Sequence, residues 1–198
     1  SVMLGAALRA LGCEVHTVRS VADDVDSFRA AIEPWLADVD LVVTSGGVSA
    51  GAYEVVKDTL TGAGVTFTKV AMQPGGPQGC GTWDGVPVVT LPGNPVSVLV
   101  SFEAFLRPAL LSSLGHSDPD RTVVRARLLE TLTSPRGKRQ FRRGFYSHPD
   151  GDVTGVVGPR GGPASHLLAA LSQANCLIVL DEDTTEAPSG SEVDVMLP

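Results

Sequence analysis

Two apolar segments of this chain each lead directly into a loop rich in Gly, Pro and Ser, and each loop is followed by a helical pattern. The first is DLVVTSGGVSAGAYEVVKDTL, residues 40–60, and the second is VPVVTLPGNPVSVLVSFEAFL, residues 86–106. A strand that ends in such a loop brings the unpaired N–H groups of a helix N-terminus to the carboxyl edge of a sheet, where an anion binds well. Two such loops on one sheet predict a cradle for a phosphorylated ligand.

Helical and strand patterns alternate up to about residue 114. Strand patterns lie at residues 13–19, 40–45, 65–70 and 86–91. The Gly-rich passage from Pro74 to Gly81 is interpreted as a loop, and Asp26 is a plausible N-cap for a helix that begins at Ser27. The alternation predicts a three-layer α/β domain with a mostly parallel sheet. Its ligand site is expected at the carboxyl ends of the strands.

The pattern changes at LGHSDPDRT, residues 114–122. Beyond it come short alternating strands that are separated by Gly, Pro, Asp and Ser: VVRARLLETL, QFRRGFYSH, GDVTGVV, CLIVLD and SEVDVML. Such strands are typical of a small antiparallel sheet or barrel, and only residues 164–175 have a helical pattern. We therefore expect an α/β domain at residues 1–117 and a small all-β, barrel-like domain at residues 118–198.

The net charge of −7 argues against a general nucleic-acid binder, because phosphate contacts normally need a basic face. One segment differs from the acidic remainder: PRGKRQFRR, residues 135–143, carries five cations in nine residues. Such a run is either a solvated surface or a contact for phosphate or another oxyanion. The composition leaves both interpretations open.

Hydrophobic residues make up 43% of the chain, enough for a real core, and we find no run that approaches the roughly 20 apolar residues of a membrane span. Cys13, Cys80 and Cys176 lie far apart without CxxC spacing, which is typical of reduced thiols in a cytoplasmic protein. The N-terminal segment is expected to form an amphipathic helix rather than a signal peptide. Because the chain opens inside a helix, we expect either a fold that begins with a helix or the C-terminal part of a longer protein.

The first loop, SGGVSAG, offers backbone amides and hydroxyl groups to a ligand. Its glycines permit positive φ and close backbone approach, and its serines add hydroxyls; these residues are Ser45, Gly46, Gly47, Ser49 and Gly51. In the helix that follows, Glu54 is a candidate for holding Mg²⁺ or orienting a water, and Lys57 for pairing with a phosphate. A tight turn followed by a helical ion pair explains the same residues without a ligand. Neither GxxxxGK[ST] nor GxGxxG occurs here.

The second loop, PGNPVS, is more specific. Pro92 and Pro95 rigidify the turn around Gly93. Asn94 exposes an amide donor and acceptor, and Ser97 lies in the first helical turn. Capping accounts for Asn94 as the N-cap and for Pro95 as the first helical residue. It does not explain why both neighbouring loops carry such residues.

Two carboxylates, Asp23 and Asp24, follow a predicted strand at the same sheet edge. They are candidates for a divalent-cation site or for an acid and a base, although most such pairs cap a helix. The four histidines show no ligand spacing, and no Ser–His–Asp arrangement is legible. A hydrolase triad is therefore not expected.

Four longer segments are TSGGVSAGAYEVVK, KVAMQPGGPQGCG, LPGNPVSVLVSFEAFLRPAL and GPASHLLAALSQANCLIVL. Together they resemble the C-terminal half of the molybdopterin molybdenumtransferases, the family that includes gephyrin. The resemblance runs through most of the chain. It implies a molybdopterin-binding α/β domain, a following β-barrel domain and an N-terminal half that this sequence lacks.

The chemistry that the resemblance implies is insertion of molybdenum from molybdate into adenylylated molybdopterin, with release of AMP and assistance from Mg²⁺ or another divalent cation. It implies that the two loops and Lys69 bind the pterin nucleotide, beside the phosphate candidate Lys57, and that Asp23 and Glu54 are the catalytic and metal-binding carboxylates. The residues implied for molybdate capture, to which Lys69 also contributes, are Gln73, Pro74, Lys138 and Ser165. The longer protein is expected to be a cytoplasmic homodimer with a shared site. The 198 residues alone should therefore turn over poorly.

Three positions depart from the family's pattern. The family usually has Asp where Glu54 stands, which shifts the metal or water geometry by about one methylene. It usually has Lys where Gln73 stands, so one positive charge is missing from the molybdate route. It more often has Arg where Lys138 stands, so bidentate geometry is lost.

Two alternatives remain. The first is a scaffold or binding module that keeps the pterin-binding fold without turnover, which the departures at Glu54 and Gln73 favour. The second is the related adenylyltransferase that makes the activated pterin. The appended β domain and PGNPVS argue against the adenylyltransferase, which is a lone α/β domain.

Overall fold

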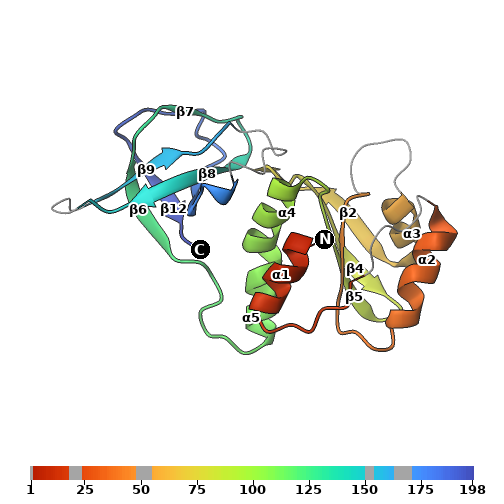
Figure 1. The fold of residues 1–198 in the computed structure, drawn as a ribbon. Helices are drawn as coiled ribbons and strands as arrows, with labels where there is room; N and C mark the ends of the chain where they lie inside the picture. Colours follow the sequence, from red (N-terminus) through yellow and green to blue (C-terminus); the bar gives the residue numbers. More distant parts are fainter. Residues whose placement is uncertain (1, 18–23, 48–54, 150–153, 163–170) are drawn as a thin grey trace. The chain divides into compact units, whose positions relative to one another are not determined.

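The computed structural model describes residues 2–17, 24–47, 55–149, 154–162 and 171–198 (Figure 1). The chain forms two compact units. The α/β unit comprises Ser1–Val70 and Gly75–Ser117, and the β unit comprises Ala71–Pro74 and Asp118–Pro198. The sequence pattern assigns Ala71–Pro74 to the first domain, but in the structure these residues belong to the second unit, because they form a strand on its sheet.

The α/β unit contains a four-stranded sheet in the order β1–β5–β4–β2. Its strands are β1 (Val42–Ser45), β2 (Val65–Lys69), β4 (Pro77–Trp83) and β5 (Val86–Leu91). β1 and β5 pair in parallel, whereas β4 pairs with both β5 and β2 in antiparallel fashion. The predicted α/β fold class is confirmed. β1, β5 and β2 run in the same direction and β4 runs against them, so the sheet is mixed.

The strand that makes the sheet mixed is β4, which lies in the Gly-rich passage interpreted as a loop. Its glycines leave room for the neighbouring strand: a Cβ on Gly81 would lie only 2.6 Å from Val65 Cα. Asp84 and Gly85 both adopt positive φ, and this turn connects β4 to β5 as a hairpin. Glycine normally weakens a strand, but here it allows close packing within the sheet.

Helices cover both faces of this sheet (Figure 1). They are α1 (Val2–Ala10), α2 (Val25–Ile32), α3 (Val55–Ala63), α4 (Pro95–Ser101) and α5 (Arg107–Ser113), with a 3-10 turn at Glu33–Trp35 and a π turn at Phe102–Leu106. α2 and α3 share a buried cluster with Val88, whereas α1 and α4 share one with Leu91. Val88 and Leu91 lie on opposite faces of β5, so the predicted three-layer arrangement is confirmed.

The segment around α2 differs from the prediction in two ways. Residues 13–17 have no regular structure where a strand was expected. The N-cap of α2 is Asp24 rather than Asp26, because Asp24 Oδ1 accepts a hydrogen bond from the Ser27 amide at 2.8 Å.

Helices α4 and α5 and the π turn between them form one helix of 19 residues, Pro95–Ser113. By length and composition alone this helix is apolar enough to cross a membrane. The prediction that the chain contains no apolar run of this length is therefore wrong. In the structure, Val98, Phe102 and Leu106 join the cluster shared with α1, and 44% of the most apolar window is buried. We interpret the segment as the core helix of the α/β unit.

The β unit contains a six-stranded sheet. Its strands are β3 (Met72–Gln73), β6 (Val123–Leu128), β8 (Arg139–Ser147), β9 (Gly155–Pro159), β10 (Cys176–Leu180) and β12 (Glu192–Met196). β10, β12, β6, β9 and β8 are successive neighbours, and β8 pairs back to β10, which closes a barrel. β7 (Leu132–Thr133) and β11 (Glu186–Ala187) form a separate pair. The predicted barrel-like fold is confirmed; the helix predicted at 164–175 falls mostly outside the described residues.

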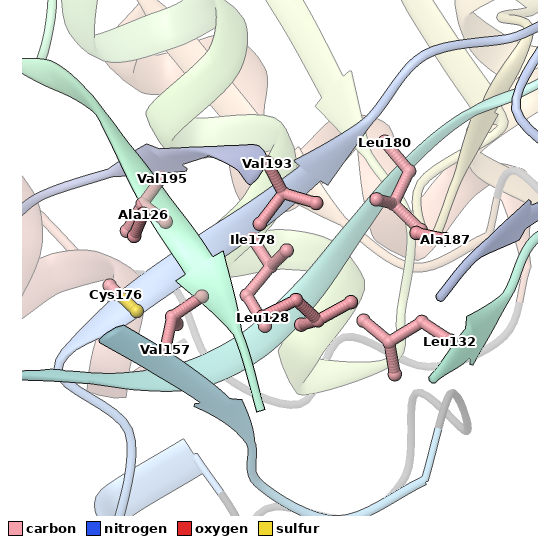
Figure 2. Packing of buried hydrophobic residues seen from close by; sticks show 10 residues of the cluster. All are labelled: Ala126, Leu128, Leu132, Val157, Cys176, Ile178, Leu180, Ala187, Val193 and Val195. Carbon is pink, nitrogen blue, oxygen red and sulfur yellow. The ribbon is translucent and has the colours of Figure 1, made fainter. Parts of the chain in front are cut away.

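Alternate residues of the barrel strands point to a common interior, as the strand period requires. Figure 2 shows this cluster: Ala126, Leu128, Leu132, Val157, Cys176, Ile178, Leu180, Ala187, Val193 and Val195. β3 is added beside β8 in parallel register, with Met72 opposite Arg139 and Gln73 opposite Gln140. A short piece of the N-terminal sequence thereby becomes part of the barrel sheet.

The packing of Gly81 predicts that Gly81→Ala lowers the free energy of unfolding by roughly 2 kcal/mol or more, because the new methyl meets backbone that cannot move aside. The matched control is Gly62→Ala in α3, where nothing lies within 4 Å. This control should raise the free energy of unfolding by about 0.5–1 kcal/mol. Urea titrations measure both. Equal effects of the two changes would contradict the described packing of β4.

A second prediction concerns Cys176 in the barrel interior. Burial raises the pKa of its thiol from 9.0 to about 11, so the native thiol stays protonated at neutral pH. The stabilisation that comes from burying this thiol is complete below its pKa in the unfolded chain. It is lost as the pH rises through the pKa of the thiol in the folded protein. A thiol reagent at pH 8 should therefore modify exposed Cys80 at least about tenfold faster than Cys176. In denaturant the two rates should become similar; equal rates in the native protein would disprove the burial.

Candidate functional site

The two Gly-rich loops lie side by side at one end of the α/β sheet. Ser45, the last residue of β1, pairs with Leu91, the last residue of β5. The Gly46 amide donates to the Leu91 carbonyl oxygen at 3.0 Å. A Cβ on Gly93 would lie 3.2 Å from Gly46 Cα, so the two loops pack backbone to backbone. The juxtaposition that the sequence predicts for an anion cradle is present in the structure.

The first loop also packs against the start of α3. Gly47 has φ of 67°, and a Cβ there would lie 2.6 Å from Val56 Cγ2. Only glycine fits this position, on both conformational and steric grounds. Lys57 is exposed one residue further along α3. Ser49, Gly51 and Glu54 lie outside the described residues.

Asn94 occupies the N-cap position of α4, with extended backbone angles (φ −69°, ψ 130°). Its carbonyl oxygen accepts from the Val98 amide at 2.9 Å, but its side chain makes no capping hydrogen bond. The capping explanation therefore accounts for the position of Asn94 and not for its side-chain amide. The residue is exposed at the rim of the sheet.

The remaining residues of the second loop have mainly structural surroundings. Pro95 begins α4, as predicted, and Pro92 is buried. Ser97 is only 4% exposed, so little of its side chain is accessible to a ligand. The exposed part of PGNPVS is the stretch from Gly93 to Pro95.

Lys69 is brought to the same sheet edge by strand direction. β2 runs antiparallel to β4, and β4 runs antiparallel to β5, so β2, β5 and β1 all run the same way. Lys69 ends β2 and is exposed. At the usual strand spacing, the end of β2 lies roughly 10 Å from the end of β5. This edge therefore combines one lysine with two packed loops.

A second group of predicted residues gathers within the β unit. Gln73 and Pro74 follow Met72 in β3, and Lys138 immediately precedes Arg139, the register partner of Met72. The Arg139 amide donates to the Ala71 carbonyl oxygen at 3.0 Å. Lys138 thus lies at the start of the short β3–β8 pair, and Gln73 and Pro74 lie at its end. The pairing brings close together residues that are separated in sequence. Ser165 lies outside the described residues.

The cationic run 135–143 does not form one exposed patch. Arg139 pairs with Asp181 at 3.6 Å and with Glu182 at 3.4 Å. Arg143 is only 4% exposed and donates to the Gly162 carbonyl oxygen. Burial lowers the pKa of both Arg142 and Arg143, and the charge of Arg143 further lowers the pKa of Arg142.

Three cations of this run form no ion pair among the residues that the structure describes. They are exposed Arg136, Lys138 and half-buried Arg142. Each therefore keeps an uncompensated positive charge, which an oxyanion would neutralise. The run combines paired, buried and unpaired cations, so the simple surface interpretation does not describe it.

Of the acidic candidates Asp23, Asp24 and Glu54, the structure describes only Asp24, which caps α2. The hydrogen bond from the Ser27 amide holds the pKa of the Asp24 carboxyl below its usual value, as expected for a helix cap. Asp23 and Glu54 lie outside the described residues. Within the described ranges there is no group of three or more His, Cys, Asp or Glu side chains that could hold a metal ion.

Two family models match the chain. One, described as a probable molybdopterin binding domain, matches residues 1–112, and the other, described as the MoeA C-terminal region (domain IV), matches residues 125–197. The chain belongs to the MoeA-like molybdopterin molybdenumtransferase family. The resemblance stated from the sequence motifs is thereby confirmed.

Individual relatives agree with this assignment. Molybdopterin molybdenumtransferase 2 of Mycobacterium tuberculosis is 50% identical over 202 residues, which cover 98% of this chain and 49% of the relative. Molybdopterin molybdenumtransferase 1 of the same organism is 39% identical, with 98% and 47% covered. The crystal structure of the molybdopterin biosynthesis MoeA protein from Pyrococcus horikoshii superposes with a TM-score of 0.78 at 30% identity, covering 99% of this chain and 46% of that one. The chain spans about half the length of these relatives.

Sequence reasoning missed two buried glutamines. Gln78 Nε2 donates to the Gly75 carbonyl oxygen at 2.8 Å and to Ser101 Oγ at 2.7 Å, which ties the start of β4 to α4. Gln140 Nε2 donates to Gln73 Oε1 at 3.0 Å. Gln78 lay in a passage interpreted as a loop. Gln140 begins the predicted strand QFRRGFYSH, but no pattern in the sequence marks this polar residue as buried.

We predict that Asn94→Ala weakens binding of adenylylated molybdopterin about tenfold, because a donor to an anion is removed. The loss of binding free energy should exceed any loss of the free energy of unfolding. Calorimetric titration and urea unfolding measure the two effects.

The control is the chain's other asparagine, Asn175, whose side chain accepts from the Tyr146 amide at 2.7 Å and donates to its carbonyl oxygen at 2.9 Å. Asn175→Ala should lower stability without changing ligand affinity. If Asn94→Ala instead lowered stability and left binding unchanged, its assignment to the ligand site would be wrong.

Proposed function

We propose that this chain is the molybdopterin-binding and barrel part of an enzyme that inserts molybdenum from molybdate into adenylylated molybdopterin and releases AMP. The observation that carries the proposal is the backbone packing of Gly46 against Gly93 at the carboxyl ends of β1 and β5. Membership in the family supports the same reaction. Because the chain covers about half of its relatives, the activity belongs to a longer protein.

In this proposal the rim of the α/β sheet binds the nucleotide end of the substrate. The Gly46 N–H group already donates to the Leu91 carbonyl oxygen, so the backbone N–H of Gly47 contacts the pyrophosphate in this proposal. Amides at such turns complement oxyanions. The Asn94 amide orients the ligand at the second loop. Lys57 and Lys69 contribute positive charge, which lowers the cost of bringing a polyanion to the sheet edge.

The β3–β8 pair supplies groups for molybdate, a small tetrahedral oxyanion. Gln73 contributes a neutral amide, and Lys138 contributes a charged ammonium group. Pro74 follows directly and shapes the backbone beside them. Ser165 completes the proposed set. Asp23 and Glu54 would supply the carboxylates for a Mg²⁺ ion.

A pterin-binding scaffold without turnover is the second candidate. The observation that favours it is the neutral Gln73–Gln140 pair, at a position where the resemblance implies a lysine. A site that lacks this cation attracts molybdate less strongly. We further propose that the longer protein is a cytoplasmic homodimer.

The test is a titration of AMP release. The 198-residue chain should bind adenylylated molybdopterin but release AMP slowly when molybdate is added. Adding the N-terminal half of the Mycobacterium tuberculosis relative in trans should accelerate release at least about tenfold, if the missing half completes the site. Binding without release in both conditions would support the scaffold. Full activity of the chain alone would disprove the shared site.

A further inference from the structure

The β unit holds a buried polar pair between β3 and β8. Gln140 is 1% exposed, and its Nε2 donates to Gln73 Oε1 at 3.0 Å. The two residues are register partners in the parallel β3–β8 pair, so their side chains leave the sheet on the same face. Gln73 is partly exposed. The hydrogen bond therefore joins a fully buried side chain, Gln140, to a partly exposed one, Gln73.

The direction of this hydrogen bond decides which end of Gln73 remains available. An amide side chain has one carbonyl acceptor and one NH₂ group with two donor hydrogens. Because the carbonyl of Gln73 is occupied by Gln140, its NH₂ group is the end that points away from the pair. Donor hydrogens suit an oxyanion, whereas a carbonyl oxygen would repel one.

Gln140 is held in place from both sides. β8 pairs with β3 at Gln140 and also with β10, where Leu180 is its register partner and joins the apolar barrel cluster. Its own Oε1 is buried and has no hydrogen-bond partner among the described residues. A buried acceptor without a partner costs free energy, and an apolar residue of similar size would avoid that cost. A stability role alone therefore does not explain a glutamine here.

We infer that Gln140 is a positioning residue that fixes the Gln73 amide with its NH₂ group toward a tetrahedral oxyanion. This inference rests on the proposed function, with molybdate as the oxyanion. Gln140 itself contacts no substrate. The orientation of the amide matters because a flipped amide would present its oxygen to the anion.

The first test measures molybdate affinity of the 198-residue chain by calorimetry. Gln140→Leu and Gln73→Leu should each weaken binding about tenfold, the effect of one hydrogen bond to a charged group. The double variant should be no weaker than either single one, because both act through the same donor. Gln173→Leu, at an exposed turn position, is the matched control and should bind like the unchanged chain.

The stability of the same variants separates positioning from packing. Gln140→Leu removes the buried orphan acceptor, so its thermal midpoint should be unchanged or raised while molybdate binding weakens. A lowered midpoint that accompanies the affinity loss would indicate a packing role. Additive losses in the double variant would also overturn the inference.

Side-chain amide NMR gives a readout that needs no ligand. The Gln140 NH₂ protons should exchange slowly with water, and those of Gln73 quickly, with the Gln73 signals shifting when molybdate is added. Slow exchange at Gln73 and fast exchange at Gln140 would overturn the inference. If the unchanged chain binds no molybdate, the proposed function loses its substrate and the inference falls with it. If the unchanged chain and Gln140→Leu bind equally, only the inference is wrong.

Discussion

The α/β unit depends on the direct approach of two backbone segments, at Gly46 and Gly93. Parallel pairing of β1 with β5 aligns the two strand ends, and the absence of side chains lets the following loops touch. A methyl group on Gly93 would press against Gly46 at 3.2 Å, and the positive φ of Gly46 excludes most other residues there. Separated loops would not direct amide hydrogens to one anion, so this contact is a condition for the proposed site.

The layers and the barrel follow from patterns that are local in sequence. Helical spacing predicts α1 through α5, and period-2 alternation predicts the barrel strands, because each element must bury one face. β4 was missed for a physical reason. Its glycines resemble a loop in composition, and the room they provide for Val65 depends on β2, which is distant from Gly81 in sequence. The sheet is mixed because β4 runs antiparallel to both of its neighbours. Without β4, this feature of the sheet could not be predicted either.

The candidate site, like the fold, has some features that the sequence predicts and others that it does not. The adjacency of the two Gly-rich loops was predictable, because parallel strands share a carboxyl edge. The role of Asp24 as the N-cap was not, since several neighbouring aspartates could cap α2 equally well. The Gln73–Gln140 pair was also beyond prediction, because it arises only when β3 joins β8. No composition or periodicity places residues 73 and 140 together.

The passage of Ala71–Pro74 through the barrel sheet affects how this architecture can change during evolution. The chain leaves the α/β sheet after β2, contributes β3 to the other unit and returns through the Val70–Gly76 hydrogen bond. Dividing the chain near residue 118 would therefore separate β8 from β3, its partner at Arg139 and Gln140. A complete β unit has to be inherited together with Ala71–Pro74, the short segment that lies between β2 and β4 in the sequence.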